Sequence, residues 1–451
     1  MNRRLRWPLV ASSASLLLLA GCGSSADEPD RAAGAAESGS APAAATVVID
    51  KPTDKPVELT GGQSLLITES GAITKTAENV FASAAVTGTG SAIGVENKGV
   101  VDTVVGENQP AILITGDAAQ VTNSGEMRMG GQNSPGIEVK GNDAEVTSSG
   151  TIQSGILGAA EQAGRDFGNN EGISVVGDRA KVNVSGSFTS AAGNGEWASL
   201  TGADLALTAD GTFESNWSNS EAFSITGPAA VASIKGTYTS RGSNSEIFSL
   251  SEADGAVVDI NASFTTAGEQ SEGLSLTGNL VKATIAGTIS TSGGQSEGFS
   301  ASAGGDNSQG PGQLQLQSDA TITTGGLNSE GISVTSRDAN LSVTGAITTN
   351  GDQSEGISYT GSGGTVTVGG AIATKGATSP GLLLNGTGIT VTINQSISTS
   401  GANSPVLQVA DGSSGITVTC APGVTLTAAG GPLYVGPAGA VTFQGCPAGL
   451  A

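Results

Sequence analysis

The chain has 451 residues, of which 70 are glycine, 3% are aromatic and none is histidine. Without histidine, no imidazole can act as a general base, assist a nucleophile or bind a metal ion. The formal net charge of −22 would repel nucleic acid, so nucleic-acid binding is not expected.

The first residues follow the order of an export signal. Three arginines lie among the first six residues, and the apolar run that follows, residues 10–20, is too short to span a bilayer comfortably. The run ends in Leu-Ala-Gly-Cys at residues 19–22, which resembles the lipobox of bacterial lipoproteins. The resemblance implies that residues 1–21 are a cleaved signal peptide and that Cys22 carries a lipid. The alternative is a plain secretory signal with a chance cysteine.

Residues 22–45 are expected to form a disordered tether. They consist mainly of Ser, Ala, Gly, Asp, Glu and Pro and show no apolar period. A flexible segment of this length has a root-mean-square reach of roughly 25 Å. Cleavage before Cys22 would remove three arginines and no acidic residue, which changes the formal net charge from −22 to −25. The folded body is expected over residues 46–451.

A four-residue corner motif, Asn-Ser-Glu-Gly or a close variant, recurs along the folded body. It returns roughly every 25 residues, which is a period typical of a solenoid in which each repeat is one turn of a stack. Two longer intervals, from Pro135 to Glu171 and from Glu297 to Glu330, mark insertions. The third residue of the motif is, in chain order, Pro110, Pro135, Glu171, Glu196, Glu221, Glu246, Glu272, Glu297, Glu330, Glu355, Pro380 and Pro405.

Each repeat contains three short runs in which apolar and polar residues alternate. In one repeat these runs are residues 332–334, 340–343 and 346–348, and polar corners separate them. The pattern predicts an all-β fold with three strands per turn, each strand paired in parallel with the next turn at ~4.8 Å. Similar residues recur at equivalent inward positions, as Phe223 and Phe248 do. We therefore expect a core of stacked side-chain ladders.

The corner motif also predicts its own backbone. Glutamate or proline followed by glycine suits the second and third positions of a type II turn. The preceding column of Asn and Gln can form amide hydrogen bonds from turn to turn. Such a ladder with three strands per turn resembles the right-handed parallel β-helices of the pectate-lyase-like superfamily and of autotransporter passenger domains. The resemblance is architectural, covers about residues 85–445 and implies a single right-handed solenoid.

Two further cysteines follow the same period. Cys420 and Cys446 are separated by one repeat, so they could face each other on adjacent turns. An exported protein permits their oxidation. We predict a disulfide that staples the last turn, where the stack lacks a neighbour and its edge is open.

The glutamates of the corner motif are the first candidate site. They occupy eight consecutive central repeats, with a serine column beside them, and proline replaces them towards both ends. One interpretation is an acidic strip that collects Ca²⁺ or cationic groups; the other is a solvated corner that keeps the protein soluble. Neither interpretation requires a cofactor. The row consists of Glu171, Glu196, Glu221, Glu246, Glu272, Glu297, Glu330 and Glu355.

Two tryptophans form the second candidate site. Trp197 and Trp217 both fall at corners on neighbouring turns, outside the predicted core columns. An exposed pair could stack against a sugar ring. Alternatively, the indoles fill gaps at corners that lack glycine.

Hydroxyl side chains form outward rows on the third strand. Their spacing resembles that of ice-binding β-helices, whose Thr-x-Thr arrays are stricter, but threonine is also a common strand residue. A glutamate pair could in principle hydrolyse a glycoside, yet nothing distinguishes one pair from the rest of the row. Catalysis is therefore not expected, and a polysaccharide lyase or hydrolase is the alternative.

These observations predict a monomeric rod held by its N-terminal lipid on a cell membrane or outer membrane, facing outside the cytoplasm. Its expected role is structural, adhesive or binding, with a polysaccharide or another surface component as partner. The alternative is a carbohydrate-binding or carbohydrate-active protein that uses the Glu/Ser strip.

Overall fold

The structure is a computed structural model that describes residues 46–75, 84–104, 109–130, 133–155, 170–190, 193–303 and 314–450. These described residues belong to one compact unit. The expected signal peptide, Cys22 and the tether lie outside the described residues. Within these ranges, no helix is long and apolar enough to cross a membrane.

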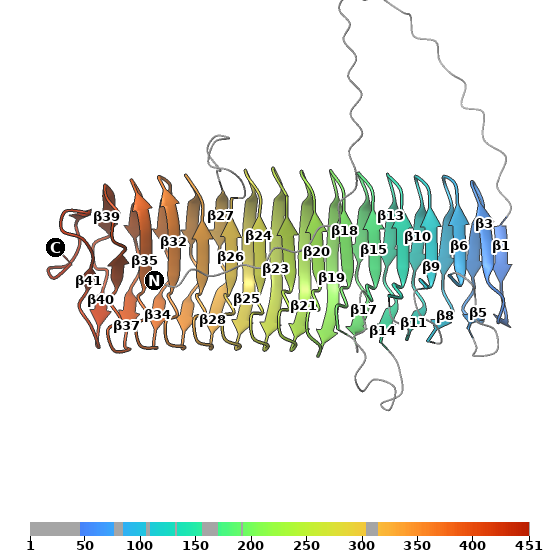
Figure 1. Ribbon diagram of the computed structural model, residues 1–451, viewed down its shortest axis with the longest axis horizontal. Helices are drawn as coiled ribbons and strands as arrows, with labels where there is room; N and C mark the ends of the chain where they lie inside the picture. Colours follow the sequence, from blue (N-terminus) through green and yellow to red (C-terminus); the bar gives the residue numbers. More distant parts are fainter. Residues whose placement is uncertain are drawn as a thin grey trace, which may run out of the picture. The chain divides into compact units, whose positions relative to one another are not determined.

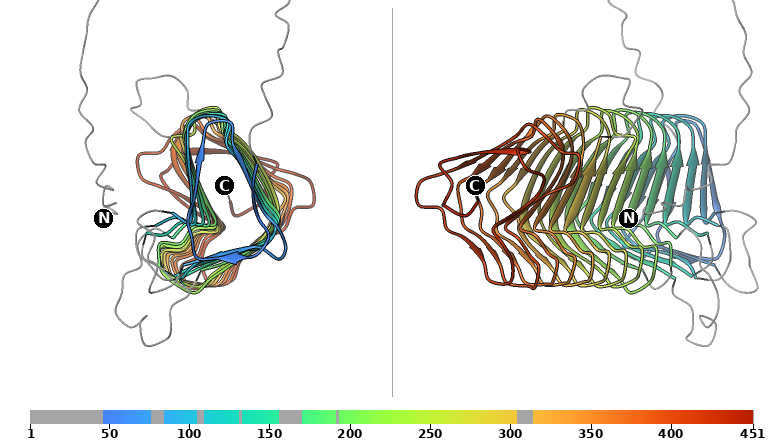
Figure 2. Two further views of the ribbon diagram at one scale, coloured as in Figure 1. Left: turned by 90° about the vertical axis from the view of Figure 1, so that its right-hand side faces the viewer. Right: turned by 60° about the vertical axis from the view of Figure 1, so that its left-hand side comes forward.

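The described chain is a parallel β-solenoid made of two long sheets (Figure 1). Most of its turns follow a similar outline when seen along the stack, and the C-terminal turns depart from it (Figure 2, left). Each turn contributes one strand to a 15-stranded sheet. These strands are β3 (Val57–Thr60), β6 (Val86–Thr89), β9 (Ile112–Thr115), β12 (Ile137–Lys140), β15 (Ile173–Val176), β18 (Ala198–Thr201), β20 (Phe223–Thr226), β22 (Phe248–Ser251), β24 (Leu274–Thr277), β26 (Phe299–Ser302), β29 (Ile332–Thr335), β32 (Ile357–Ser362), β35 (Leu382–Thr387), β38 (Leu407–Val409) and β41 (Tyr434–Val435).

The remaining strands of the turns form a 27-stranded sheet. They are β1 (Thr46–Ile49), β2 (Pro52–Thr53), β4 (Ser64–Ile67), β5 (Ala72–Thr74), β7 (Gly94–Asn97), β8 (Val100–Thr103), β10 (Gln120–Asn123), β11 (Glu126–Met129), β13 (Glu145–Ser148), β14 (Thr151–Ser154), β16 (Lys181–Val184), β17 (Ser187–Ser190), β19 (Ala206–Ser215), β21 (Val231–Ser240), β23 (Val257–Thr266), β25 (Lys282–Thr291), β27 (Gln315–Ser318), β28 (Thr321–Thr324), β30 (Asn340–Val343), β31 (Ile347–Thr349), β33 (Thr365–Val368), β34 (Ile372–Thr374), β36 (Thr390–Ile393), β37 (Ile397–Thr399), β39 (Ile416–Cys420), β40 (Leu426–Ala428) and β42 (Val441–Gln444).

The register of the strands confirms the predicted repeat length. Ile332 pairs with Ile357 in one sheet, and Ile347 pairs with Ile372 in the other. A turn such as β29, β30 and β31 has the three strands that the sequence predicts. In four consecutive turns the second and third strands join into one ten-residue strand, as in β21, so a turn holds two or three strands.

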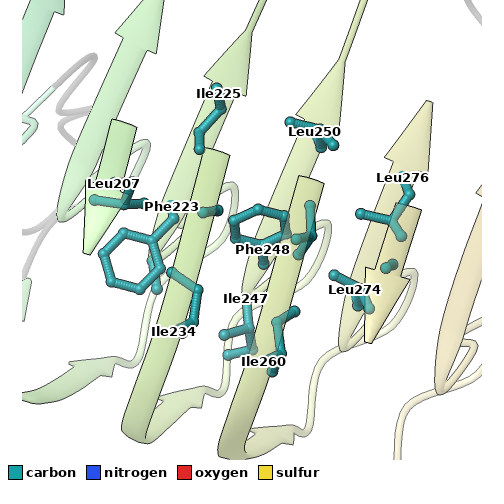
Figure 3. Close-up of a cluster of buried hydrophobic side chains, with 14 of the residues drawn as sticks. Leu207, Phe223, Ile225, Ile234, Ile247, Phe248, Leu250, Ile260, Leu274 and Leu276 are labelled. Carbon is teal, nitrogen blue, oxygen red and sulfur yellow. The ribbon is translucent and has the colours of Figure 1, made fainter. Parts of the chain in front are cut away.

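The core consists of stacked ladders, as predicted. Phe223 pairs in register with Phe248, which pairs with Leu274, and their side chains follow one another along the stack (Figure 3). All three side chains are fully buried. Burying one such side chain contributes roughly 1.5–3 kcal/mol, and every turn repeats this gain.

The backbone of the corner differs from the predicted type II turn. The residue with positive φ is the amide that opens the motif, with φ of 51° at Asn328 and 54° at Gln353. Asparagine tolerates this left-handed conformation better than most residues. The corner glycine is needed for close packing: a Cβ on Gly331 would lie 2.4 Å from Ile347 Cγ2 and 2.6 Å from the Gly356 carbonyl oxygen.

Serine, the second residue of the motif, makes a hydrogen-bonded ladder that the sequence analysis missed. The Ser329 N–H donates to Ser354 Oγ at 3.0 Å, and the Ser354 N–H donates to Ser379 Oγ at the same distance. These serines are fully buried. The predicted amide contact occurs where Gln270 Nε2 donates to Gln295 Oε1 at 3.0 Å.

The C-terminal turn carries the predicted cysteine pair. The sulfur atoms of Cys420 and Cys446 lie 2.00 Å apart, at the distance of a disulfide. Cys420 ends β39, and Cys446 follows β42, the neighbouring strand of the last turn. The bond therefore joins the last turn to the turn before it.

Candidate functional site

The structure brings the eight glutamates into one row along the stack. Backbone hydrogen bonds join successive corners of the row: the Gly298 N–H donates to the Glu330 carbonyl oxygen and the Gly331 N–H to that of Glu355, both at 2.9 Å. The serines beside them are also in register, as Ser300 is with Ser333. Neighbouring glutamates of the row therefore lie one turn apart, at ~4.8 Å.

The row is largely withdrawn from solvent. Glu297 is 5% exposed and Glu330 is 7% exposed, and the other six glutamates are partly buried. The interpretation of the row as a solvated corner is therefore wrong. Two unit charges ~4.8 Å apart would repel by roughly 1 kcal/mol in water and by several at an effective dielectric near 20.

Burial changes the acidity of the row. Burial, and secondly the charge of Glu171, raise the pKa of Glu196 to about 7. The same two causes, burial and then the neighbouring glutamates, raise the pKa of Glu221 and of Glu272 well above the usual value. Burial also raises the pKa of Glu171, at the end of the row. Desolvation disfavours the ionised form of a carboxyl, and a like charge nearby adds to the effect.

The polar contacts of the row involve its own members and the serine column. Ser300 Oγ donates to Glu272 Oε2, and the nearby carboxyl group of Glu297 adds to burial in raising the pKa of Glu272. Against the effect of burial, Ser199 lowers the pKa of Glu196 in part, and the buried Glu196 Oε2 has no hydrogen-bond partner among the residues that the structure describes. The serine column therefore solvates part of the row in place of water.

A metal centre is not evident in the part of the chain that the structure describes. No group of three or more His, Cys, Asp or Glu side chains there is arranged to hold a metal ion. Binding of Ca²⁺ along the glutamate row stays a prediction from the sequence.

The two tryptophans have different environments. Trp197 is 1% exposed and stacks on Phe223, with ring centroids 5.6 Å apart and an interplanar angle of 25°. It takes the place of the corner glycine, and the adjacent inward position is the small Ala198. Trp197 therefore fills space in the core, and the prediction of an exposed sugar-stacking pair is wrong. Trp217 is 43% exposed.

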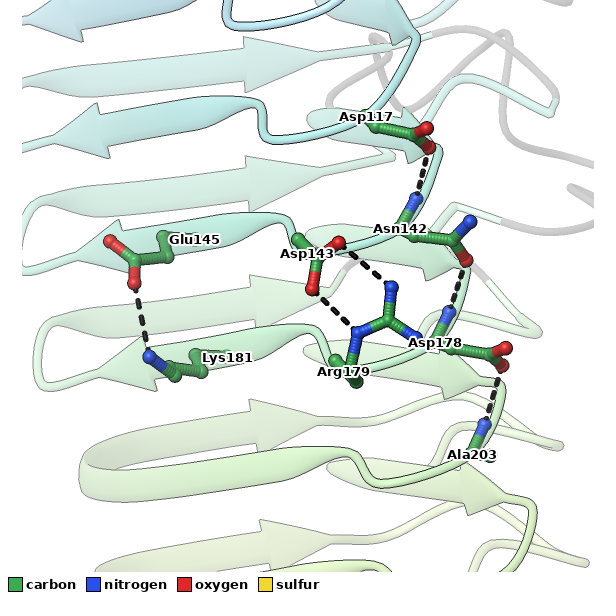
Figure 4. Close-up of polar contacts among 8 residues, drawn as sticks. All are labelled: Asp117, Asn142, Asp143, Glu145, Asp178, Arg179, Lys181 and Ala203. Atoms are coloured by element: carbon green, nitrogen blue, oxygen red, sulfur yellow. Dashed lines mark hydrogen bonds and ion pairs between the residues drawn. The ribbon is translucent and has the colours of Figure 1, made fainter. Parts of the chain in front are cut away.

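A second corner carries a polar ladder that the sequence analysis did not predict (Figure 4). The Asn142 N–H donates to Asp117 Oδ1 at 2.8 Å, and the Asp178 N–H donates to Asn142 Oδ1 at 2.9 Å. Beside this ladder, Arg179 Nε and Nη2 donate to the two carboxylate oxygens of Asp143 at 2.7 and 2.8 Å. The ion pair is exposed, and such pairs contribute little to stability. The recurrence of Asp and Asn at one-turn spacing in the sequence could have predicted this ladder.

A groove of about 700 Å³ lies on the outer face of strands β23, β25, β27, β30 and β33. Uncharged polar side chains predominate along it, and Asp259 and Lys282 add one charge of each sign. Thr365 Oγ1 donates to Asn340 Oδ1 at 2.8 Å across adjacent turns. The polar lining includes Thr284, Gln315, Gln317, Asn340, Ser342, Thr365 and Thr367. The sequence shows that these polar residues alternate with apolar ones, but it does not predict that they line a groove.

Comparisons with protein-family models, with curated proteins and with solved structures found no match.

Proposed function

We propose that the chain is a lipid-anchored, right-handed β-helical rod that acts at the cell surface in a structural, adhesive or binding role without catalysis. It resembles the pectate-lyase-like superfamily and autotransporter passenger domains in architecture. The lipobox-like residues 19–22 support an anchor at Cys22 on a cell membrane or outer membrane. Acyl chains on one residue anchor a protein firmly when more than one chain is present.

The observation that carries this proposal is the continuity of the stack. Turns pair in register from β1 to β42, and equivalent outward positions repeat once per turn along both sheets. In a repeat of this kind, one turn contacts only its neighbours, so the surface extends without a single central site. A long periodic surface suits a spacer or a contact with another extended molecule.

The anchor is tested with the substitution Cys22→Ser. We expect the wild-type protein to incorporate a labelled fatty acid, to fractionate with membranes and to be cleaved by protease added to intact cells. Cys22→Ser should abolish the label and move the protein out of the membrane fraction. The double variant Cys420→Ser/Cys446→Ser is the matched control and should keep the label. Incorporation of the label by Cys22→Ser would contradict the anchor.

A second candidate function is binding of a neutral polysaccharide, and the polar groove favours it. The Glu/Ser strip suits this role less well, because its carboxyl groups are largely buried. The groove instead presents hydroxyl and amide groups such as Thr284, Gln317 and Ser342 in one column across adjacent turns. Hydroxyl and amide groups both donate and accept hydrogen bonds, as the hydroxyls of a sugar do.

The groove is tested on a glycan array, with and without Ca²⁺. The triple variant Thr284→Ala/Gln317→Ala/Ser342→Ala should lose at least about tenfold in affinity for any glycan that the wild type binds, as expected for three lost hydrogen bonds. The control Thr288→Ala/Ser290→Ala/Thr323→Ala changes outward hydroxyls on strands β25 and β28 of the same turns and should bind like the wild type. Equal affinity of all three proteins would exclude the groove as the binding surface.

A further inference from the structure

We propose that the glutamate row makes the stability of the solenoid sensitive to pH, because its stacked carboxyl groups share protons at neutral pH. As the pH falls, the folded chain takes up further protons and becomes more stable. This inference is independent of the surface role proposed above, because it concerns the stability of the central turns.

The first argument is geometric. Eight consecutive turns each place one glutamate at the same corner, with ~4.8 Å between turns. Glu297 and Glu330 are almost fully buried, so water cannot screen their charges well. A fully ionised row of this kind would repel itself along its whole length. Protonation of some members removes this repulsion without any movement of the backbone.

The second argument is the proximity of the carboxyl groups of Glu272 and Glu297, which contributes to the raised pKa of Glu272 after burial. An ionised carboxylate can only accept hydrogen bonds, so a bond between two carboxyl groups requires a proton on one of them. At the same time, Ser300 Oγ donates to Glu272 Oε2. A proton on Glu272 would let these two carboxyl groups hydrogen-bond, and the hydroxyl of Ser300 can stabilise the charge that remains when that proton leaves.

The third argument is the absence of basic neighbours on the adjoining strands. The strands that follow the eight glutamates contain no lysine or arginine; they are β15, β18, β20, β22, β24, β26, β29 and β32. Beyond the first end of the row, Glu138 on β12 adds a further acidic charge that acts on Glu171, and its own partner is Lys140, with Nζ 2.6 Å from Oε1. Glu269 and Asp352, three residues before Glu272 and Glu355, are exposed acids. The adjoining strands therefore supply no cationic side chain for the glutamate row, and protonation can neutralise its negative charge instead.

The direction of the pH effect follows from linkage. The pKa of Glu196 rises to about 7 in the folded chain, whereas an unfolded glutamate titrates near pH ~4.3. Between these values the folded chain binds more protons than the unfolded chain, so its stability decreases as the pH rises. The stabilisation is fully present below about pH 4.3 and is lost as the pH passes through about 7.

The experiment measures thermal unfolding of the full-length protein from pH 7.5 to 5.0. We expect the midpoint temperature to rise by about 5 °C or more towards the acidic end. The variant Glu221→Gln/Glu272→Gln should unfold at a higher temperature than the wild type at pH 7.5 and should respond less to pH. Glu269→Gln changes an exposed glutamate at the same corner and should keep the wild-type profile.

An infrared measurement makes the test independent of the variants' folding. At pH 7 the wild-type protein should show the C=O stretching band of protonated carboxyl groups, and the double glutamine variant should show a weaker band. A midpoint temperature that stays flat or falls towards pH 5.0, or the lack of this band at pH 7, would overturn the proposal. A rise of the midpoint with Ca²⁺ at pH 7.5, in a protein that lacks the band, would show neutralisation by cations instead.

Discussion

Replacing Gly298 with alanine should destabilise the solenoid by about 3 kcal/mol or more. A Cβ at this corner glycine would lie 2.4 Å from the Gly331 carbonyl oxygen and 2.4 Å from Ile322 Cγ2. The Gly331 oxygen belongs to the stacked backbone, so relief requires the two turns to separate and weakens their ladder hydrogen bonds. The free energy of unfolding, measured by denaturant titration followed by circular dichroism, checks this expectation.

Gly294 provides a matched control four residues earlier in the same turn. A Cβ there would lie 3.6 Å from the Leu327 carbonyl oxygen, which is an ordinary contact. Gly294→Ala should therefore be neutral or stabilising by up to about 1 kcal/mol, since alanine restricts the unfolded chain. Equal losses in the two variants would mean that glycine is required at the corner for another reason than close packing.

Replacing Trp197 with alanine should cost about 3 kcal/mol of folding free energy. The indole is buried, stacks on Phe223 and reaches beneath Gly211, where a Cβ would lie 2.6 Å from Trp197 Cη2. Its removal leaves a cavity that the rigid ladders cannot close. Part of the loss is offset, because Trp197 Nε1 is buried and no described residue forms a hydrogen bond with it.

Two further variants separate these contributions. Trp197→Phe keeps the stacking on Phe223 and removes the unsatisfied N–H, so it should stay within about 1 kcal/mol of the wild type. Trp217→Ala changes the exposed tryptophan and should cost less than about 0.5 kcal/mol. Denaturant titrations of the three variants compare these values, and a loss at Trp217 as large as that at Trp197 would contradict the assignment of Trp197 to the core.

The repeat made most of the fold predictable. Residues with the same role recur at one-turn spacing, so the parallel pairing, the Phe223–Phe248 ladder and the Cys420–Cys446 contact could be inferred by aligning the repeats. The corner backbone was predicted incorrectly, because glycine suits both a positive φ and a close contact. The sequence pattern does not distinguish these two uses, and here the asparagine adopts the positive φ.

The sequence predicts the position of the glutamate row but not its burial. The eight central glutamates could be counted in the sequence, and a polar residue at a corner would ordinarily be assigned to solvent. Their burial results from neighbours on the turns above and below, which lie a full repeat away in the chain. The same reasoning applies to Trp197, which lies at a corner in the alignment yet reaches the core through the space left by Gly211 and Ala198.

The sequence by itself determined the solenoid, its period and the position of the row, because periodicity is a property of single residues and their spacing. Only the tertiary structure decided which side chains are withdrawn from water. Because the turns stack at ~4.8 Å, each glutamate covers the next one. The solvent exposure and the pKa of each glutamate therefore depend on its neighbours in the row.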